Sequence, residues 1–271
     1  MYIIKKTDNT AWAVITGINN YQGAILRYCG ADAIVLKNSL IGSDFWSNAE
    51  IVKQYNVSVT KSMIQNAITE AKNNVKPCGT FVFFYSGHGS SDNTIGYIIP
   101  QDGISNGYAD LSKCISETEL QTWLGQFDSS VKKVCLLDSC FSGEFIDKFA
   151  LKYNNQDQSV PKFVAPKGST SGSNPDFGKS LSVIENMVTI SASGRYEYSY
   201  ENSVLKNGYF TYFLIEGLGN SGTIYGPADF NTSKSITAEE SYSYLSPKVT
   251  NYKSNQHPKI NDNYVGEITI K

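Results

Sequence analysis

Short apolar runs alternate along the chain with segments in which apolar residues recur three and four positions apart. The runs are rich in Val, Ile, Phe and Tyr, which is typical of strands buried on both faces of a parallel sheet. They predict strands over 11–18, 49–55, 79–86, 132–138 and 186–192. The spaced apolar residues predict helices over 30–41, 60–74, 116–126, 208–219 and 237–249. This alternation predicts an α/β fold with a mainly parallel central sheet flanked by helices on both faces.

One polar stretch, residues 150–182, interrupts this pattern. It is rich in Asn, Gln, Ser, Pro, Gly and Lys and has few apolar residues. A structureless stretch of this length is uncommon inside a compact domain and is usually functional or disordered. It divides the chain into a larger part, 1–149, and a smaller part, 183–271, which has too few strands to form a core alone. We therefore expect a single domain over 1–271 that contains a polar linker.

Composition and charge exclude some classes of partner. The chain has 271 residues, 41% of them hydrophobic, and a formal net charge of -2. Such a chain can bury a substantial core, and it has no excess of positive charge to attract nucleic acid or an anionic membrane. No run approaches the roughly 18 apolar residues of a membrane span, and no apolar leader follows the first lysines. We expect a soluble, cytoplasmic protein with no nucleic-acid or membrane partner.

The cysteines and histidines limit the chemistry that the chain can carry. Its five cysteines are odd in number and lack the paired spacing of a disulfide framework or a zinc site, which indicates free thiols. His88 and His257 are the only histidines. Any catalysis by a cysteine and a histidine therefore has two candidate histidines.

Two small-residue turns follow predicted strands. YSGHG at 85–89 carries His88, and DSCFSGEF at 138–145 carries Cys140. Because the carboxyl ends of parallel strands lie at one edge of a sheet, these side chains should lie close together. The alternatives are a histidine in a surface turn and a buried structural cysteine, a role that suits Cys135 within VCLLD better.

A neighbouring cysteine and histidine are suited to acyl transfer. The thiolate is the nucleophile, and an imidazole can stabilise it and later protonate a leaving amine. The backbone amides of Gly89 and Cys140 could stabilise the oxyanion that develops. His257, in the polar stretch SNQHPK, lacks this setting.

The SGHG turn, the DSC turn and NGYFTYFLIEGL at 207–218 resemble the caspase-like peptidases of clan CD, particularly metacaspases and their bacterial relatives. The resemblance spans about residues 11–268 and implies the caspase-hemoglobinase fold. It implies that His88 and Cys140 form the catalytic dyad and that Gly89 and Cys140 supply the oxyanion-hole amides. In this family the histidine can act mainly on the leaving group, so a resting ion pair is not required.

The same resemblance indicates the pocket for the residue before the scissile bond, called P1. CGAD at 29–32 is similar to the metacaspase C-x-x-D element, which implies a pocket lined by Cys29, Asp32, Ser86 and Asp138. Metacaspases prefer Arg or Lys at P1, whereas animal caspases bind Asp through arginines. Two carboxylates favour a cationic side chain, most strongly the planar guanidinium of Arg.

The alternative, an acidic P1 residue, depends on the two arginines of the chain. Arg27 is one residue out of register with the pocket arginine of animal caspases, and Arg195 lies in a loop that could face the substrate. Glu197 and Glu201 near that loop would add negative charge at the rim. We therefore expect cleavage after Arg or Lys.

Many metacaspases need calcium, which binds a small carboxylate cluster. Glu117 and Asp147 fit two positions of that pattern, but Ile95 and Thr118 occupy others and supply no carboxylate. Ca²⁺ usually takes six to eight oxygen ligands, so we expect that the protein requires no calcium and no other cofactor.

Family members are often cut between their larger and smaller parts. Lysines that could be cut lie at Lys148, Lys152, Lys162 and Lys167, and the sequence does not single one out. We expect a monomer that acts on peptide or protein substrates. The competing hypotheses are a non-catalytic caspase-like binding module and a Cys–His amidase of small molecules.

Overall fold

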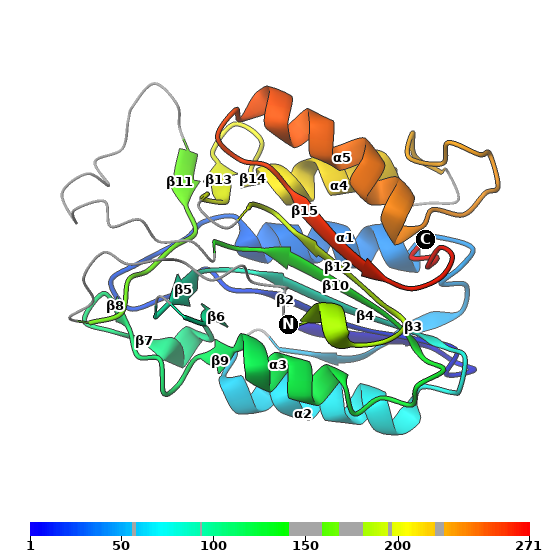
Figure 1. The fold of residues 1–271 in the computed structure, drawn as a ribbon, viewed down its shortest axis with the longest axis horizontal. Coiled ribbons are helices and arrows are strands. Elements are labelled where there is room, and N and C mark those ends of the chain that lie inside the picture. Colours follow the sequence, from blue (N-terminus) through cyan, green and yellow to red (C-terminus); the bar gives the residue numbers. More distant parts are fainter. Residues whose placement is uncertain (56–57, 93, 141–158, 168–180, 195–196, 220–224) are drawn as a thin grey trace.

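The computed structural model describes residues 1–55, 58–92, 94–140, 159–167, 181–194, 197–219 and 225–271 (Figure 1). Its main sheet contains β1 (Tyr2–Lys6), β2 (Ala11–Gly17), β3 (Ala49–Gln54), β4 (Thr80–Ser86), β10 (Lys132–Asp138), β12 (Met187–Ser191) and β15 (Lys259–Asn263). The helices are α1 (Cys29–Ile41), α2 (Lys61–Asn74), α3 (Glu117–Leu124), α4 (Tyr209–Leu218) and α5 (Ala238–Tyr252). Among these described residues, no helix combines the length and apolar character needed to span a membrane.

The main sheet is mixed and has a parallel centre. Its strand order is β15-β12-β10-β4-β2-β1-β3. Strands β2, β4, β10 and β12 pair in parallel, whereas β1 runs antiparallel to both of its neighbours and β15 runs antiparallel to β12. The parallel centre places the carboxyl ends of β4 and β10 side by side.

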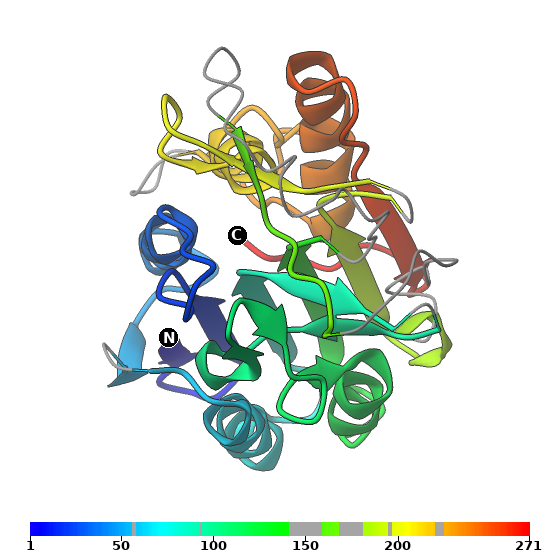
Figure 2. The ribbon, with the colours of Figure 1, turned by 90° about the vertical axis from the view of Figure 1, so that its left-hand side faces the viewer.

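Helices cover both faces of this sheet (Figures 1 and 2). Helices α1, α4 and α5 pack on one face, and α2 and α3 pack on the other. Side chains of β4 alternate between the two cores: Phe81 and Phe83 belong to the core with α2 and α3, whereas Val82 and Phe84 belong to the core with α1 and α4. Burial on both faces explains why the central strands read as continuous apolar runs.

The fold predicted from the pattern is confirmed. All five predicted strands and all five predicted helices are present, with ends that differ by at most three residues. The pattern missed β1, whose two buried residues Ile3 and Ile4 stand before lysines, and β15, whose sequence KINDN is largely polar. Strand β15 lies at the edge of the sheet and is partly exposed, so it does not need an apolar run.

Smaller strands surround the carboxyl end of the main sheet. They are β5 (Gly89–Ser91), β6 (Gly96–Ile98), β7 (Ile104–Ser105), β8 (Tyr108–Ala109), β9 (Ile115–Ser116), β11 (Ser159–Pro161), β13 (Tyr200–Asn202) and β14 (Asn207–Gly208). Strand β11 belongs to the stretch 150–182, which was expected to lack regular structure. It is ordered here because it pairs with β13.

Candidate active site

Strands β4 and β10 bring the two predicted turns together. They pair in parallel with Ser86 opposite Asp138, so the turns that follow leave the sheet at the same level. A Cβ placed on Gly89 would lie 1.7 Å from the carbonyl oxygen of Cys140, a distance that no side chain tolerates. Only glycine allows this contact, and it brings the His88 turn directly against the backbone of Cys140.

The imidazole of His88 is held in one orientation. Its Nε2 lies 2.7 Å from the carbonyl oxygen of Ala24. A carbonyl only accepts hydrogen bonds, so Nε2 carries the proton of the neutral ring and Nδ1 keeps its lone pair. Nδ1 is buried, and no group in the described part of the chain forms a hydrogen bond with it. Burial lowers the pKa of His88 to about 4, although the carbonyls of Ala24 and Lys162 oppose this shift.

The thiol of Cys140 is buried as well. Its Sγ accepts a hydrogen bond from the amide of Ser199 at 2.8 Å and donates to the carbonyl of the same residue at 3.0 Å. Burial raises the pKa of Cys140, while contacts with the backbone of Ser199 and Lys162 oppose the shift. A neutral thiol and a neutral imidazole therefore stand in the site at neutral pH, rather than an ion pair.

The amides of Gly89 and Cys140 converge on one oxygen atom. The carbonyl oxygen of Lys162 accepts hydrogen bonds from the amide of Gly89 at 2.9 Å and from the amide of Cys140 at 3.3 Å. These are the two amides that the sequence indicated as oxyanion donors. A peptide carbonyl of the chain itself occupies their shared position.

The side chain of Lys162 enters the predicted P1 pocket. Its Nζ lies 2.9 Å from Asp138 Oδ1, 3.2 Å from Asp32 Oδ2 and 3.0 Å from Ser86 Oγ. All these side chains are buried. Burial opposes the charged ammonium, but the carboxylates of Asp138 and Asp32 outweigh it and raise the pKa of Lys162. The fourth predicted pocket residue, Cys29, is also fully buried, and burial raises the pKa of its thiol.

The carboxylates of the pocket are fixed by donors from the smaller part of the chain. Asp32 Oδ1 accepts from Asn207 Nδ2 at 2.8 Å and from the amide of Gly208 at 3.0 Å. Asp138 Oδ2 accepts from Thr211 Oγ1 at 2.7 Å. The sequence reasoning assigned these residues no role, although they belong to the NGYFT motif that it singled out.

Residues 159–165 cross the candidate site in extended form. Strand β11 pairs antiparallel with β13, and the amide of Lys162 then donates to the carbonyl of Ser199 at 2.9 Å. On the other side of Lys162, the amide of Val164 donates to the carbonyl of Gly89 at 3.0 Å. Figure 2 views the molecule from the end at which the candidate site lies, and it shows this segment running across that end. Hydrogen bonds on both sides of Lys162 thus hold it in the manner of a bound peptide.

Several other predicted residues lie elsewhere. Glu201, expected at the pocket rim, is buried, and its carboxylate accepts hydrogen bonds from the amides of Arg27 and Tyr28 just before α1. The Arg27 side chain is exposed to solvent, and Arg195 lies outside the described residues. The carboxylate of Glu197, the other residue expected at the rim, contacts His257.

Among the described residues, no carboxylate cluster forms around the calcium candidates. Glu117 is buried in the first turn of α3, and Asp147 lies outside the described residues. In the described part of the chain, no three His, Cys, Asp or Glu side chains gather as a metal site would require. Calcium independence stays a prediction.

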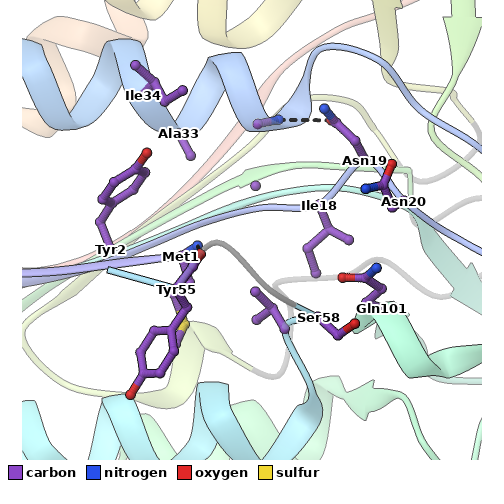
Figure 3. Close-up of a pocket in the computed structure, with 13 residues that line it drawn as sticks. Met1, Tyr2, Ile18, Asn19, Asn20, Ala33, Ile34, Tyr55, Ser58 and Gln101 are labelled. Carbon is purple, nitrogen blue, oxygen red and sulfur yellow. Dashed lines mark hydrogen bonds between the residues drawn. The ribbon is translucent and has the colours of Figure 1, made fainter. Parts of the chain in front are cut away.

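A separate pocket of about 530 Å³ is lined in part by the turn after β2 (Figure 3). The side chains that line it include Asn19, Asn20, Ser58 and Gln101. Neither His88 nor Cys140 lines it. Asn19 accepts from the amide of Gly30 at 2.9 Å, so this pocket adjoins the start of α1 but carries no candidate catalytic group.

Comparisons with known proteins bear on the fold and the family of the chain. The crystal structure of a protein from Geobacter sulfurreducens has a similar fold, with a TM-score of 0.55, 18% sequence identity and 92% of each chain covered. No curated protein matches the sequence. A family model described as the caspase domain matches residues 10–263. The chain therefore belongs to the caspase domain family of cysteine peptidases.

Proposed function

We propose that this protein is a cysteine endopeptidase that cleaves after basic residues, with Cys140 as the nucleophile and His88 as its proton partner. The position of Lys162 is the observation that carries this proposal. Its ammonium contacts Asp32, Asp138 and Ser86, and its carbonyl accepts from the amides of Gly89 and Cys140. An external peptide with a basic P1 residue would direct its cationic group to the same carboxylates.

The chemistry follows from the protonation states of the two groups. Because burial raises the pKa of Cys140 and lowers that of His88, the thiol loses its proton as it attacks the carbonyl carbon, and Nδ1 of His88 accepts that proton. The oxyanion is stabilised by the amides of Gly89 and Cys140. The C–N bond then breaks, and His88 returns the proton to the leaving amine. Water hydrolyses the thioester, which regenerates the thiol and releases a carboxylic acid.

The first substrate in this proposal is the chain itself. Of the four candidate lysines, Lys162 is fully buried in the pocket, Lys167 is exposed, and Lys148 and Lys152 lie outside the described residues. Self-cleavage should therefore break the bond between Lys162 and Phe163. Because the segment is docked within its own chain, the reaction should be first order, with a half-time that does not depend on protein concentration.

Mass spectrometry of the purified chain, together with turnover of peptides bearing Lys, Arg or Asp at P1, tests the proposal. The wild type should form two fragments with a new end at Lys162 and should hydrolyse the basic peptides. Cys140→Ala should remain intact and inactive. Cys135→Ala is the matched control, because Cys135 is equally buried but lies in the middle of β10, and it should keep both activities.

Two outcomes would contradict the proposal. Unchanged cleavage by Cys140→Ala would assign the chemistry to another group. Faster hydrolysis of the Asp peptide than of the Lys peptide would exclude the acidic pocket as the P1 site. The exposed position of the Arg27 side chain supports the basic preference, since it leaves Asp32 and Asp138 as the charged groups around the Lys162 ammonium.

A further inference from the structure

The acceptors around the Lys162 ammonium match the number of its donors. A lysine Nζ has three hydrogens, and three oxygen atoms surround it, from Asp138, Asp32 and Ser86, at 2.9 to 3.2 Å. The second oxygen of each carboxylate already accepts hydrogen bonds from Asn207, Gly208 or Thr211. The pocket thus presents acceptors for one compact cation, and its remaining carboxylate oxygens are engaged by the chain.

The end of the pocket is closed just beyond Nζ. A Cβ placed on Gly208 would lie 2.5 Å from Nζ of Lys162 and 2.1 Å from Oδ2 of Asp138. The backbone of Gly208 is therefore a wall of the pocket, and glycine is the residue that leaves room for the ammonium. All side chains that contact Nζ are fully buried, so no described opening leads from this point to solvent.

An arginine side chain would fit this pocket poorly. If an Arg side chain followed the same path as the side chain of Lys162, its Cζ atom would stand where the lysine Nζ stands. Its two terminal nitrogens would extend about one bond length further. Those nitrogens would meet the wall at Gly208 and the engaged carboxylates. A guanidinium also carries five N–H donors in a rigid fork, more than the three acceptors could satisfy, and an unsatisfied buried donor is costly.

We infer that this P1 pocket selects Lys over Arg and that Gly208 and Ser86 set this selectivity. The inference rests on the proposed peptidase function and sharpens it. It also reverses the expectation from sequence that a guanidinium would bind most strongly, because that expectation considered charge without the length of the pocket.

Matched peptides with the sequence Ser-Val-Pro-Lys or Ser-Val-Pro-Arg before a fluorogenic leaving group test the inference. These peptides copy residues 159–162. With the full chain, kcat/KM should be at least tenfold higher for the Lys peptide. A ratio near one, or a higher value for the Arg peptide, would overturn the inference. If the chain cleaves neither peptide and does not cut itself, the proposed function fails instead.

A second arm uses the docked segment as the substrate. Lys162→Arg changes only the side chain in the pocket and keeps every flanking residue. Its self-cleavage should be at least tenfold slower than that of the wild type, as measured by mass spectrometry over time. Equal rates would contradict the selectivity even if the peptides were excluded from the cleft by the docked segment.

Ser86→Ala tests how the pocket achieves this selectivity. It removes one of three acceptors from the ammonium and adds space for a terminal nitrogen, so the Lys to Arg ratio should fall by about tenfold. Ser90→Ala is the matched control, because Ser90 is buried nearby and its hydroxyl has no hydrogen bond with the described residues. A loss of folded protein would lower both rates together, so the ratio separates a change of selectivity from damage to the fold. An unchanged ratio in Ser86→Ala would reject the role of this hydroxyl.

Discussion

The carbonyl oxygen of Lys162 lies 2.9 Å from the amide nitrogen of Gly89, within the pair of amides expected to stabilise an oxyanion. The same residue places its ammonium between Asp32 and Asp138. The chain therefore fills with its own segment both the proposed P1 pocket and the proposed position of the oxyanion. Under the proposed function, a substrate from outside would have to displace that segment or would bind only after the segment is cut.

Lys162 should stabilise the uncut chain through its contacts with the two carboxylates. In a Cys140→Ala background, which should prevent self-cleavage, Lys162→Met keeps an unbranched side chain, one atom shorter, but leaves two buried carboxylates without their cation. Loss of one partner from a buried ion pair typically costs about 3 to 5 kcal/mol, so the variant should unfold at a clearly lower temperature. Lys167→Met is the control, because the exposed Lys167 should contribute less than about 0.5 kcal/mol.

The loss of stability caused by Lys162→Met should depend on pH, which tests whether unpaired charge causes that loss. Burial raises the pKa of Asp32 and the Lys162 ammonium opposes this shift, so without the ammonium the carboxyl takes up a proton at a higher pH. The destabilisation by Lys162→Met should then be smaller at pH 5 than at pH 7. An equal loss at both values would point to packing rather than to unpaired charge.

His88 should make the fold less stable in acid. Its pKa in the folded protein is about 4, against about 6.5 in an unfolded chain, so between these values the unfolded state binds a proton that the folded state does not. The stabilisation is complete above pH 6.5 and is lost as the pH falls toward 4, by about 3 kcal/mol in total. His88→Gln in the Cys140→Ala background should lack this component. Denaturant unfolding at several pH values measures it, and parallel pH profiles for the two proteins would refute the assignment.

Much of the fold could be predicted because the central strands are buried on both faces and so appear as apolar runs. The site could be predicted in part, since His88 and Cys140 follow neighbouring parallel strands and the resemblance indicated Asp32, Ser86 and Asp138. These residues do lie together in the structure.

What the sequence could not show depends on contacts between distant segments. Lys162 is one lysine among four, and it is singled out by the pairing of β11 with β13, about forty residues apart, which no local pattern encodes. A signal did exist, because Val160, Pro161, Phe163 and Val164 form an apolar patch in a polar stretch. Glu201 was placed at the rim because it lies near the Arg195 loop in the sequence, but it is buried, and backbone amides of a distant loop offset the cost of its burial.

Glu201 should hold the start of α1 in place for the pocket. Its carboxylate accepts from the amides of Arg27 at 2.8 Å and Tyr28 at 2.9 Å, directly before Cys29 and near Asp32. In Glu201→Gln, one carboxylate oxygen becomes an amide nitrogen that cannot accept. The amides of Arg27 and Tyr28 must then share the one oxygen that remains, and their hydrogen bonds lose the negative charge of the acceptor. The free energy of unfolding in the Cys140→Ala background should fall by about 2 kcal/mol. When Cys140 is present, the rate of cleavage of Lys peptides should fall as well. Glu50→Gln, which alters a surface ion pair with Lys5, should change stability by less than about 1 kcal/mol and leave cleavage unchanged. Equal effects of the two variants would show that Glu201 does not anchor this loop.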